Sequence, residues 1–400
     1  MTSVPPTRDG YPADLRALTS LRAFLAVGVV LFHYQLQWDP ALGFSPIIER
    51  SRLAVDAFFM LSGFILAHVY GPAFASRGFS YRRFIVARLA RLYPLHVAVL
   101  TGALIMVLGA TAAGVRFDAE GYGPLAFFQT LFLIQAWFPT DAELNWSGPS
   151  WSLSAEWFAY LLFPAYAWLA LRLRARPWVL LGIGAAAFVV LDAFYVQAFG
   201  KVLPRAEDSL GILRIAPEFL VGMALYGLGH RWRWSPPVAA AAALSTTVLL
   251  LGAMQLSLDD RTIVALAAPV ILTWSLLARA DCEGPLAAPG LVFAGEASFA
   301  LYLVHMPVIV AWKGVVAELR GVDSTFRITP VELIGLFIAT ALIAAALHLL
   351  VEKPGRTWIR RRFDRRRDGL APAALRFPPA LRRRSLRKKA ADDAFDIAER

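Results

Sequence analysis

Ten long apolar segments follow one another along this chain of 400 residues, and they constrain its fold more than any other feature. A helix of about 20 largely apolar residues is long enough to cross the hydrocarbon core of a bilayer. Lipid offers no hydrogen bonds to the backbone, so a span of this length must be helical. The predicted spans cover residues 19–38, 52–70, 92–111, 153–171, 178–198, 212–229, 236–254, 262–279, 291–312 and 330–351. We therefore expect an all-α integral membrane protein with about ten transmembrane helices.

The composition agrees with a membrane protein and excludes several kinds of site. Hydrophobic residues make up 58% of the chain, above the roughly 45–50% that is usual for a soluble domain. Cys282 is the only cysteine, so an internal disulfide and the usual cysteine-based zinc or iron–sulfur sites are excluded. The chemistry considered below requires no metal.

The net charge of +11 is concentrated in the C-terminal tail. From Glu352 onwards there are 16 Lys and Arg residues against seven Asp and Glu residues. Basic residues that directly follow an apolar span hold that end in the cytoplasm and contact anionic lipids. We therefore expect membrane lipids, and no nucleic acid, as partners of the tail.

One further apolar stretch, Pro124 to Phe138, is shorter than a comfortable span. Five arginines between residues 77 and 91 place that connection in the cytoplasm by the positive-inside rule. The arginines at 172–176 fall on the same side only if the short stretch does not cross the membrane. We therefore expect a re-entrant half-helix in the outer leaflet and both termini in the cytoplasm.

Three regions follow from this topology. We expect residues 1–18 to be a cytoplasmic N-terminal segment without a cleavable signal, since no small-residue cleavage site ends the first apolar run. Residues 19–355 form the transmembrane domain. Residues 356–400 form a basic cytoplasmic tail that we expect to be disordered.

Two ionisable residues, Arg22 and His33, lie on the first predicted span. Ionisable groups inside a membrane are costly and indicate function by default. Eleven residues of helix separate the two by about three turns and about 16 Å, so they share a face at two depths. Arg22 falls at the cytoplasmic mouth, where it could also reach lipid headgroups, and His33 falls in the outer half.

Further charged residues are candidates on the next two spans. Asp56 opens the second span near the depth of His33, where it could orient the imidazole or face its own helix dipole. Arg88 and Arg91 are spaced i, i+3 and share a helical face. Arginines bind phosphate oxygens well, although such a cluster can also serve only as a topology signal.

Polar and aromatic residues gather at two later spans. Ser152 and Glu156 are spaced i, i+4, and the surrounding Trp146, Trp151 and Trp157 fit a carbohydrate-facing platform or an aromatic belt. Tyr302 and His305, at i, i+3, could line the same cavity. Arg214 and Glu218, at i, i+4, are expected to neutralise each other.

Six motifs in this order resemble the membrane acyltransferase 3 family over about 330 residues. They are Arg22 followed by His33, then VDAFFMLSGFI, RRFIVARLARLYP, WSLSAEWFAYLLFP, GEASFALYLVHMPV and the closing Glu352-Lys353-Pro354. One motif departs from the family, because Ala155-Glu156-Trp157 retains a single carboxylate where two acidic or acid–amide positions are common. Some members carry a fused hydrolase-like domain, which we do not expect in this chain.

The resemblance implies transfer of an acyl group, often acetyl, from acyl-CoA to a hydroxyl of a glycan, lipid-linked sugar or small metabolite. His33 matches the family's catalytic histidine, and Arg22, Arg88 and Arg91 match its donor-associated arginines. His33 would act as a general base or be acylated itself. Asp56 or Glu156 would hold the imidazole or the acceptor, with Trp151, Ser152, Tyr302 and His305 around the substrate.

The resemblance also implies that acyl-CoA is a donor substrate and that no cofactor is tightly bound. It places the chain in a bacterial inner membrane. Two other classes of protein remain as alternatives at this point. A transporter or flippase could use the same buried charges, although the sequence has no inverted repeat to support it. A noncatalytic membrane scaffold would not need the buried histidine and arginines.

Overall fold

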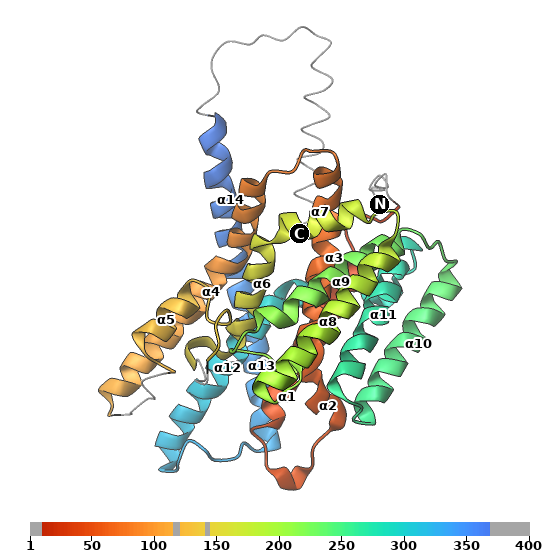
Figure 1. Cartoon of the computed structure of the whole chain (residues 1–400). Coiled ribbons are helices and arrows are strands. Elements are labelled where there is room, and N and C mark those ends of the chain that lie inside the picture. The colour runs from red at the N-terminus through yellow and green to blue at the C-terminus, as the bar shows by residue number, and fades with distance from the viewer. Residues whose placement is uncertain (1–9, 115–120, 141–144, 369–400) are drawn as a thin grey trace.

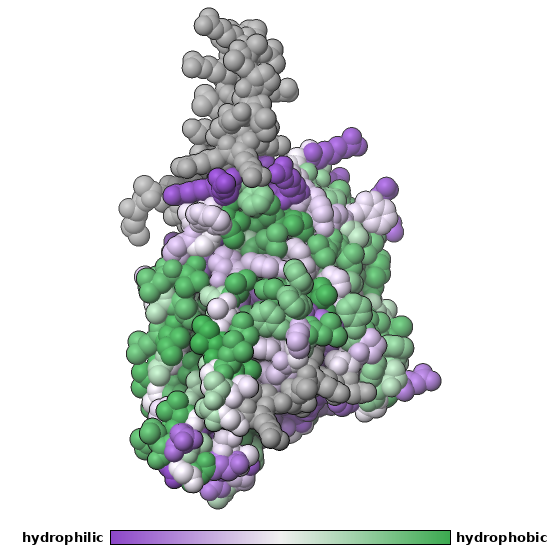
Figure 2. Space-filling view, turned by 90° about the vertical axis from the view of Figure 1, so that its left-hand side faces the viewer, coloured by the Kyte–Doolittle hydropathy of each residue, from purple (hydrophilic) through white to green (hydrophobic). Residues whose placement is uncertain are grey.

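The computed structural model describes residues 10–114, 121–140 and 145–368, and the elements in these ranges are helical (Figure 1). Within them, nine helical segments are long and apolar enough to cross a membrane. They contain α1 Arg16–Gln35, α3 Ala54–Ala75, α4 Tyr81–Ala112, α8 Pro177–Phe199, α9 Ile212–Gly229, α10 Pro236–Gln255, α11 Asp260–Arg279, α12 Pro289–Arg320 and α13 Pro330–Leu347. Hydrophobic residues dominate the middle of the molecular surface in Figure 2, which agrees with a multi-pass membrane protein.

The remaining predicted span, residues 153–171, is not one continuous helix. It consists of α6, Trp151–Leu161, and α7, Phe163–Arg172, with Leu162 between them. Pro164 is the second residue of α7, and a proline has no backbone N–H to continue the hydrogen bonds of a preceding helix. The apolar pattern identified the segment correctly, but the proline divides it into two helices that are each shorter than a span.

The short apolar stretch forms a short helix and a return. Helix α5 covers Pro124–Leu131 and is about 12 Å long, too short to cross the bilayer. Leu133 then adopts a left-handed φ of 57°, which reverses the chain. The returning Gln135 and Ala136 bond to Ser150 and Ser154 inside the bundle. This geometry agrees with the predicted half-helix.

Close approach of helices at glycine residues positions the two helices that carry the candidate histidines. A Cβ atom on Gly295 of α12 would lie 1.9 Å from the carbonyl oxygen of Thr19 on α1. Likewise, a Cβ on Gly222 of α9 would lie 1.9 Å from the carbonyl oxygen of Met60 on α3. Small residues permit such contacts between membrane helices, so α1 and α12 lie side by side, as do α3 and α9.

The C-terminal span does not end at the boundary that the sequence suggested. Helix α13 continues through a π-helical turn, His348–Glu352, into α14, Lys353–Asp368. Helix α14 packs against α4, where a Cβ on Gly355 would come within 2.5 Å of the Pro94 side chain. The first part of the basic tail is therefore helix packed on the bundle, and residues 369–400 lie outside the described part of the chain.

The residues before α1 also pack on the bundle. Tyr11 is buried, and its hydroxyl lies 3.0 Å from Ser275 Oγ on α11. Its ring stacks on Tyr226 of α9, and the guanidinium of Arg279 lies over it at 5.4 Å. Asp14 and Arg16 line the same cavity as Arg356 and Arg360, so the described ends of the chain lie at one end of the bundle.

Candidate active site

Two histidines, one from α1 and one from α12, are in contact within the bundle. His33 Nδ1 lies 3.2 Å from His305 Nε2, although the two residues are 272 positions apart. The ring centroids are 4.8 Å apart. His305 is fully buried, and His33 is partly accessible. The sequence predicted both residues separately, but only the packing of α1 on α12 brings them into contact.

Backbone carbonyl oxygens define which nitrogens of the pair carry protons. His33 Nδ1 lies 2.9 Å from the carbonyl oxygen of Val29, and His305 Nδ1 lies 2.6 Å from that of Tyr302. A carbonyl oxygen only accepts hydrogen bonds, so each Nδ1 carries the proton in the neutral pair. The single Nδ1–H of His33 is then shared between the Val29 carbonyl oxygen and His305 Nε2. The Nε2 atom of His33 is left with its lone pair available, as a base or a nucleophile requires.

Tyr302 and Ser152 lie next to the histidine pair. The Tyr302 hydroxyl is 2.8 Å from Ser152 Oγ and donates to the carbonyl oxygen of Pro149 at 3.0 Å. The Tyr302 ring lies 5.9 Å from that of His305 and 6.4 Å from that of Phe58. These contacts bring α12, α6 and α3 together beside His305, and they confirm that Tyr302 and Ser152 belong to one cluster.

A cavity of about 570 Å³ extends from this cluster to the end of the bundle that carries α14. Phe58, Ser152 and Tyr302 line it near the histidines. Cationic residues from three helices and the N-terminal segment line its other part. These residues are Arg16, Arg22, Arg88, Arg91, Lys353, Arg356 and Arg360. The cavity also contains the carboxylates of Asp14, Glu156 and Glu296, so cations outnumber carboxylates by seven to three.

The three predicted arginines all line this cavity, but their surroundings differ. Arg91 pairs with Glu352 and lies over the ring of Phe299. Arg88 donates to the Tyr70 hydroxyl at 3.0 Å. Arg22 forms no ion pair or hydrogen bond with any residue that the structure describes, and it faces the cavity. A guanidinium in such a position is available to an anionic ligand.

Glu156 lines the cavity and does not contact His33. Its Oε1 accepts hydrogen bonds from the hydroxyl groups of Ser62 and Tyr160. The tryptophans that suggested a carbohydrate platform lie elsewhere: Trp146 and Trp151 are only 5% and 7% exposed. Trp151 packs under the guanidinium of Arg214 at 5.1 Å. The structure therefore uses these two rings in packing, rather than as a platform or a belt at the surface.

Asp56 does not lie against His33 as the sequence suggested. Both its carboxylate oxygens bond to Arg214, at 2.9 Å from Nε and 2.6 Å from Nη2. Arg214 therefore pairs with Asp56 on α3 and not with Glu218 on its own helix, contrary to expectation. The sequence correctly indicated that these charged residues lie in the bundle. It could not show that the guanidinium of Arg214 would pair with a carboxylate from another helix.

The sequence interpretation missed the contribution of α14 to the cavity. Arg356 and Arg360 were assigned to a disordered tail, yet they line the cavity beside Arg22 and Arg88. Their i, i+4 spacing places them on one helical face, which was the available signal. The high density of arginine after residue 360 concealed it, because a basic run of this kind usually faces solvent or lipid.

Comparisons with known proteins show the family of this chain. A family model described as an acyltransferase domain matches residues 15–349. Acyltransferase MdmB of Streptomyces mycarofaciens is 30% identical over 363 residues, which cover 85% of this chain and 91% of that protein. YrhL of Bacillus subtilis, provisionally named a peptidoglycan O-acetyltransferase, is 23% identical over 87% of this chain and 56% of its own length. No solved structure matches the chain significantly.

Proposed function

The chain belongs to the acyltransferase 3 family, and we propose that it moves an acetyl group from cytoplasmic acetyl-CoA to a hydroxyl group on the opposite side of the membrane. The acceptor in this proposal is a glycan, a lipid-linked sugar or a small metabolite, and the membrane is a bacterial inner membrane. Relatives named as acyltransferase or as O-acetyltransferases support the reaction class. Acyl-CoA acts as a substrate, and no tightly bound cofactor is needed.

The observation that carries the proposal is the cavity that runs from the arginines to Tyr302, whose ring lies 5.9 Å from that of His305. Neither His33 nor His305 is among the residues that line this cavity. The cationic part suits the phosphates of CoA, since guanidinium groups bind phosphate through charge-assisted hydrogen bonds. Arg22 offers the unpaired guanidinium. Between Arg22 and His33 the helix rises about 16 Å, a length that the extended pantetheine arm would follow along α1. The thioester would then lie beside Phe58 and Tyr302.

In the proposed reaction, His33 Nε2 removes the proton from the acceptor hydroxyl. The hydroxyl oxygen attacks the thioester carbonyl carbon, the new C–O bond forms, and the C–S bond breaks. The CoA thiolate leaves and takes up the proton from the imidazolium. The Val29 carbonyl and His305 hold the ring so that Nε2 remains the basic nitrogen throughout.

In this proposal the remaining residues position the helices and the reacting groups, and they take no part in making or breaking bonds. Ser152 and Tyr302 hold α6 against α12 beside the reacting atoms. Glu156, which accepts hydrogen bonds from Ser62 and Tyr160, offsets part of the positive charge next to Arg22. The Asp56–Arg214 pair supports the bundle from α3 and α9 and does not contact His33.

The test follows radiolabel from acetyl-CoA into glycan and lipid fractions of membranes that contain the full chain. We expect His33→Asn to lose at least about a hundredfold in labelling, the size of a typical general-base contribution. His230→Gln is a matched control, because His230 packs on Tyr11 and Tyr226 outside the cavity. Equal labelling by wild type and His33→Asn would overturn the enzyme mechanism. A transporter would label no product at all in this assay.

A further inference from the structure

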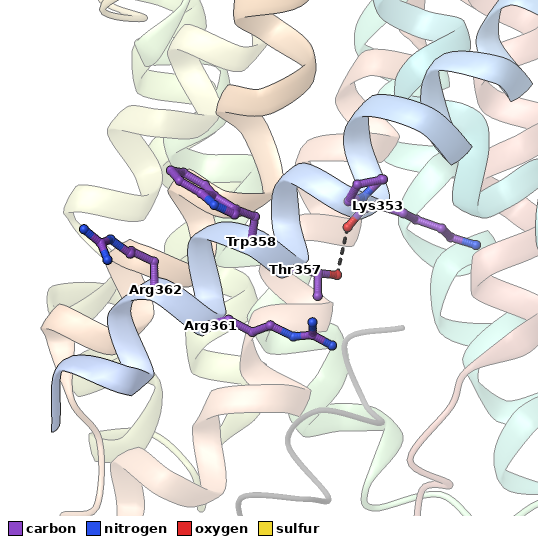
Figure 3. Close-up of a pocket in the computed structure, with 6 residues that line it drawn as sticks. Lys353, Thr357, Trp358, Arg361 and Arg362 are labelled. Carbon is purple, nitrogen blue, oxygen red and sulfur yellow. Dashed lines mark hydrogen bonds between the residues drawn. The ribbon is translucent and has the colours of Figure 1, made fainter. Parts of the chain in front are cut away.

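Residues of helix α14 line two hollows, and the proposed acyl transfer uses only one of them. Arg356 and Arg360 line the cavity described above. The two neighbouring rows, 353-357-361 and 354-358-362, are each spaced by four residues and therefore lie side by side on another face. Figure 3 shows side chains of both rows projecting from α14. Lys353, at the start of one row, also lines the cavity and pairs with Glu296 of α12.

These six residues line a surface hollow of about 660 Å³. Trp358 is 68% exposed, although a large aromatic ring is costly to leave in water. Arg361 and Arg362 are exposed, and neither forms an ion pair with any residue in the described ranges. Thr357 donates to the carbonyl oxygen of Lys353, and Lys353 Nζ is 3.0 Å from Glu296. The hollow therefore combines two available guanidinium groups with one exposed indole.

The depth of this hollow relative to the membrane follows from the helix that leads to it. Helix α13 begins at Pro330, and about 20 residues of helix span the roughly 30 Å hydrocarbon core. The core then ends near residue 350, so the Cα atom of Lys353 lies about 5 Å beyond that level, that of Trp358 about 12 Å and that of Arg362 about 18 Å. Helical side chains tilt towards the N-terminus of their helix, which directs Trp358, Arg361 and Arg362 back towards the bilayer.

We propose that this hollow binds the headgroup of an anionic phospholipid. Arg361 and Arg362 contact the phosphate and the anionic headgroup, while the indole of Trp358 packs among the headgroups. Tryptophan is enriched at this depth, and basic residues next to a span attract anionic lipids. The position beside a membrane span favours a lipid over a soluble acidic protein. The proposal does not depend on acyl transfer by the histidine pair.

The experiment uses the full chain purified in a nonionic detergent. Phosphatidylglycerol and phosphatidylcholine are titrated separately, and native mass spectrometry measures the fraction of protein with bound lipid. We expect the wild type to prefer phosphatidylglycerol. We expect Arg361→Gln/Arg362→Gln to weaken phosphatidylglycerol binding about tenfold or more, because it removes both available charges next to the phosphate. Inorganic phosphate at the same concentrations should not displace the lipid.

A matched control removes the same charge elsewhere. Arg174 and Arg176 are exposed residues that follow α7 and lie outside the hollow. Arg174→Gln/Arg176→Gln should change phosphatidylglycerol binding less than twofold, and thermal melting should show that both double variants remain folded. Equal loss in both variants would overturn the site in favour of general attraction to positive charge. No preference of the wild type for phosphatidylglycerol over phosphatidylcholine would also overturn it, and would favour a protein partner.

Discussion

Arg214 and Arg22 are both arginines within helices of the bundle, yet the protein uses them in opposite ways. Arg214 is 1% exposed and bonds through two nitrogens to Asp56, which is completely buried. A third nitrogen donates to the carbonyl oxygen of Ala206. Arg22 faces the cavity without an ion pair in the described part of the chain. The first arginine is satisfied by the protein, and the second is available to a ligand.

This difference shows how a charge inside a membrane protein can be interpreted. Burial alone does not separate a structural arginine from a binding arginine, because both are costly to remove from water. The presence or absence of a carboxylate partner within the protein distinguishes the two kinds of arginine. A bidentate carboxylate completes the guanidinium of Arg214, whereas the open side of Arg22 requires an anion from outside the protein.

The largest effect on stability is expected when the buried ion pair between Asp56 and Arg214 is broken. Asp56→Asn removes the carboxylate that bonds two nitrogens of the buried Arg214 and should destabilise the protein by about 3–5 kcal/mol. Thermal unfolding in detergent and the yield of monodisperse protein measure this. Replacing both partners, as in Asp56→Leu/Arg214→Leu, should recover part of the stability. A single variant as stable as the wild type would show that the pair does not hold α3 and α9 together.

Replacement of Arg22 should weaken binding of the acyl donor and leave the stability of the fold unchanged. We expect Arg22→Gln to leave thermal stability within error and to raise the KM for acetyl-CoA about tenfold or more, with a small change in kcat. Transfer from acetyl-pantetheine, which lacks the nucleotide phosphates, provides the control and should respond much less. An equal loss with both donors would contradict phosphate binding by Arg22.

The smallest effect is expected for a carboxylate at the surface. Asp259 caps α11 by accepting from Thr262 and Arg261, and the Thr262 hydroxyl, followed by the backbone N–H groups, lowers the pKa of Asp259. A lowered pKa means that the cap stabilises the fold above the carboxyl group's unfolded pKa, and that this stability is lost as pH falls through the folded pKa.

Asp259→Ala should therefore cost only about 0.5 kcal/mol at neutral pH, at the low end for an N-cap. The difference in melting temperature between variant and wild type should shrink as the buffer is acidified below pH 4. Asp259→Asn, which can still cap the helix, should retain most of the stability at every pH. A cost as large as that of Asp56→Asn would remove the contrast between buried and exposed carboxylates.

Much of the fold could be predicted because a lipid environment leaves few choices. Nine of the ten predicted spans correspond to helices long enough to cross the membrane. The remaining segment, residues 153–171, was also predicted. Its division at Leu162 was not, because the apolar pattern continues through the break between the two helices. The short α5 was predicted from the arginines around it, which limit where the chain can cross.

The candidate site could be predicted only in part. Family motifs identified His33, Arg22, Arg88 and Arg91, and the structure places the three arginines in one cavity. The partner of His33 was expected to be a carboxylate, whereas the residue in contact with it is His305. Nothing in the spacing of two spans 272 residues apart specifies which of their faces meet. That contact depends on Gly295, which allows α12 to approach α1.

The sequence by itself determined that this chain is a bundle of membrane helices from the acyltransferase 3 family. Long apolar runs must be helical in lipid, and the order of six motifs is independent of how the helices pack. Only the tertiary structure decided that Asp56 neutralises Arg214, that His305 supports His33 and that α14 completes the cationic cavity. These pairings depend on contacts between helices that are distant in sequence. The packing of those helices determines which charged groups pair with each other and which remain available to a ligand.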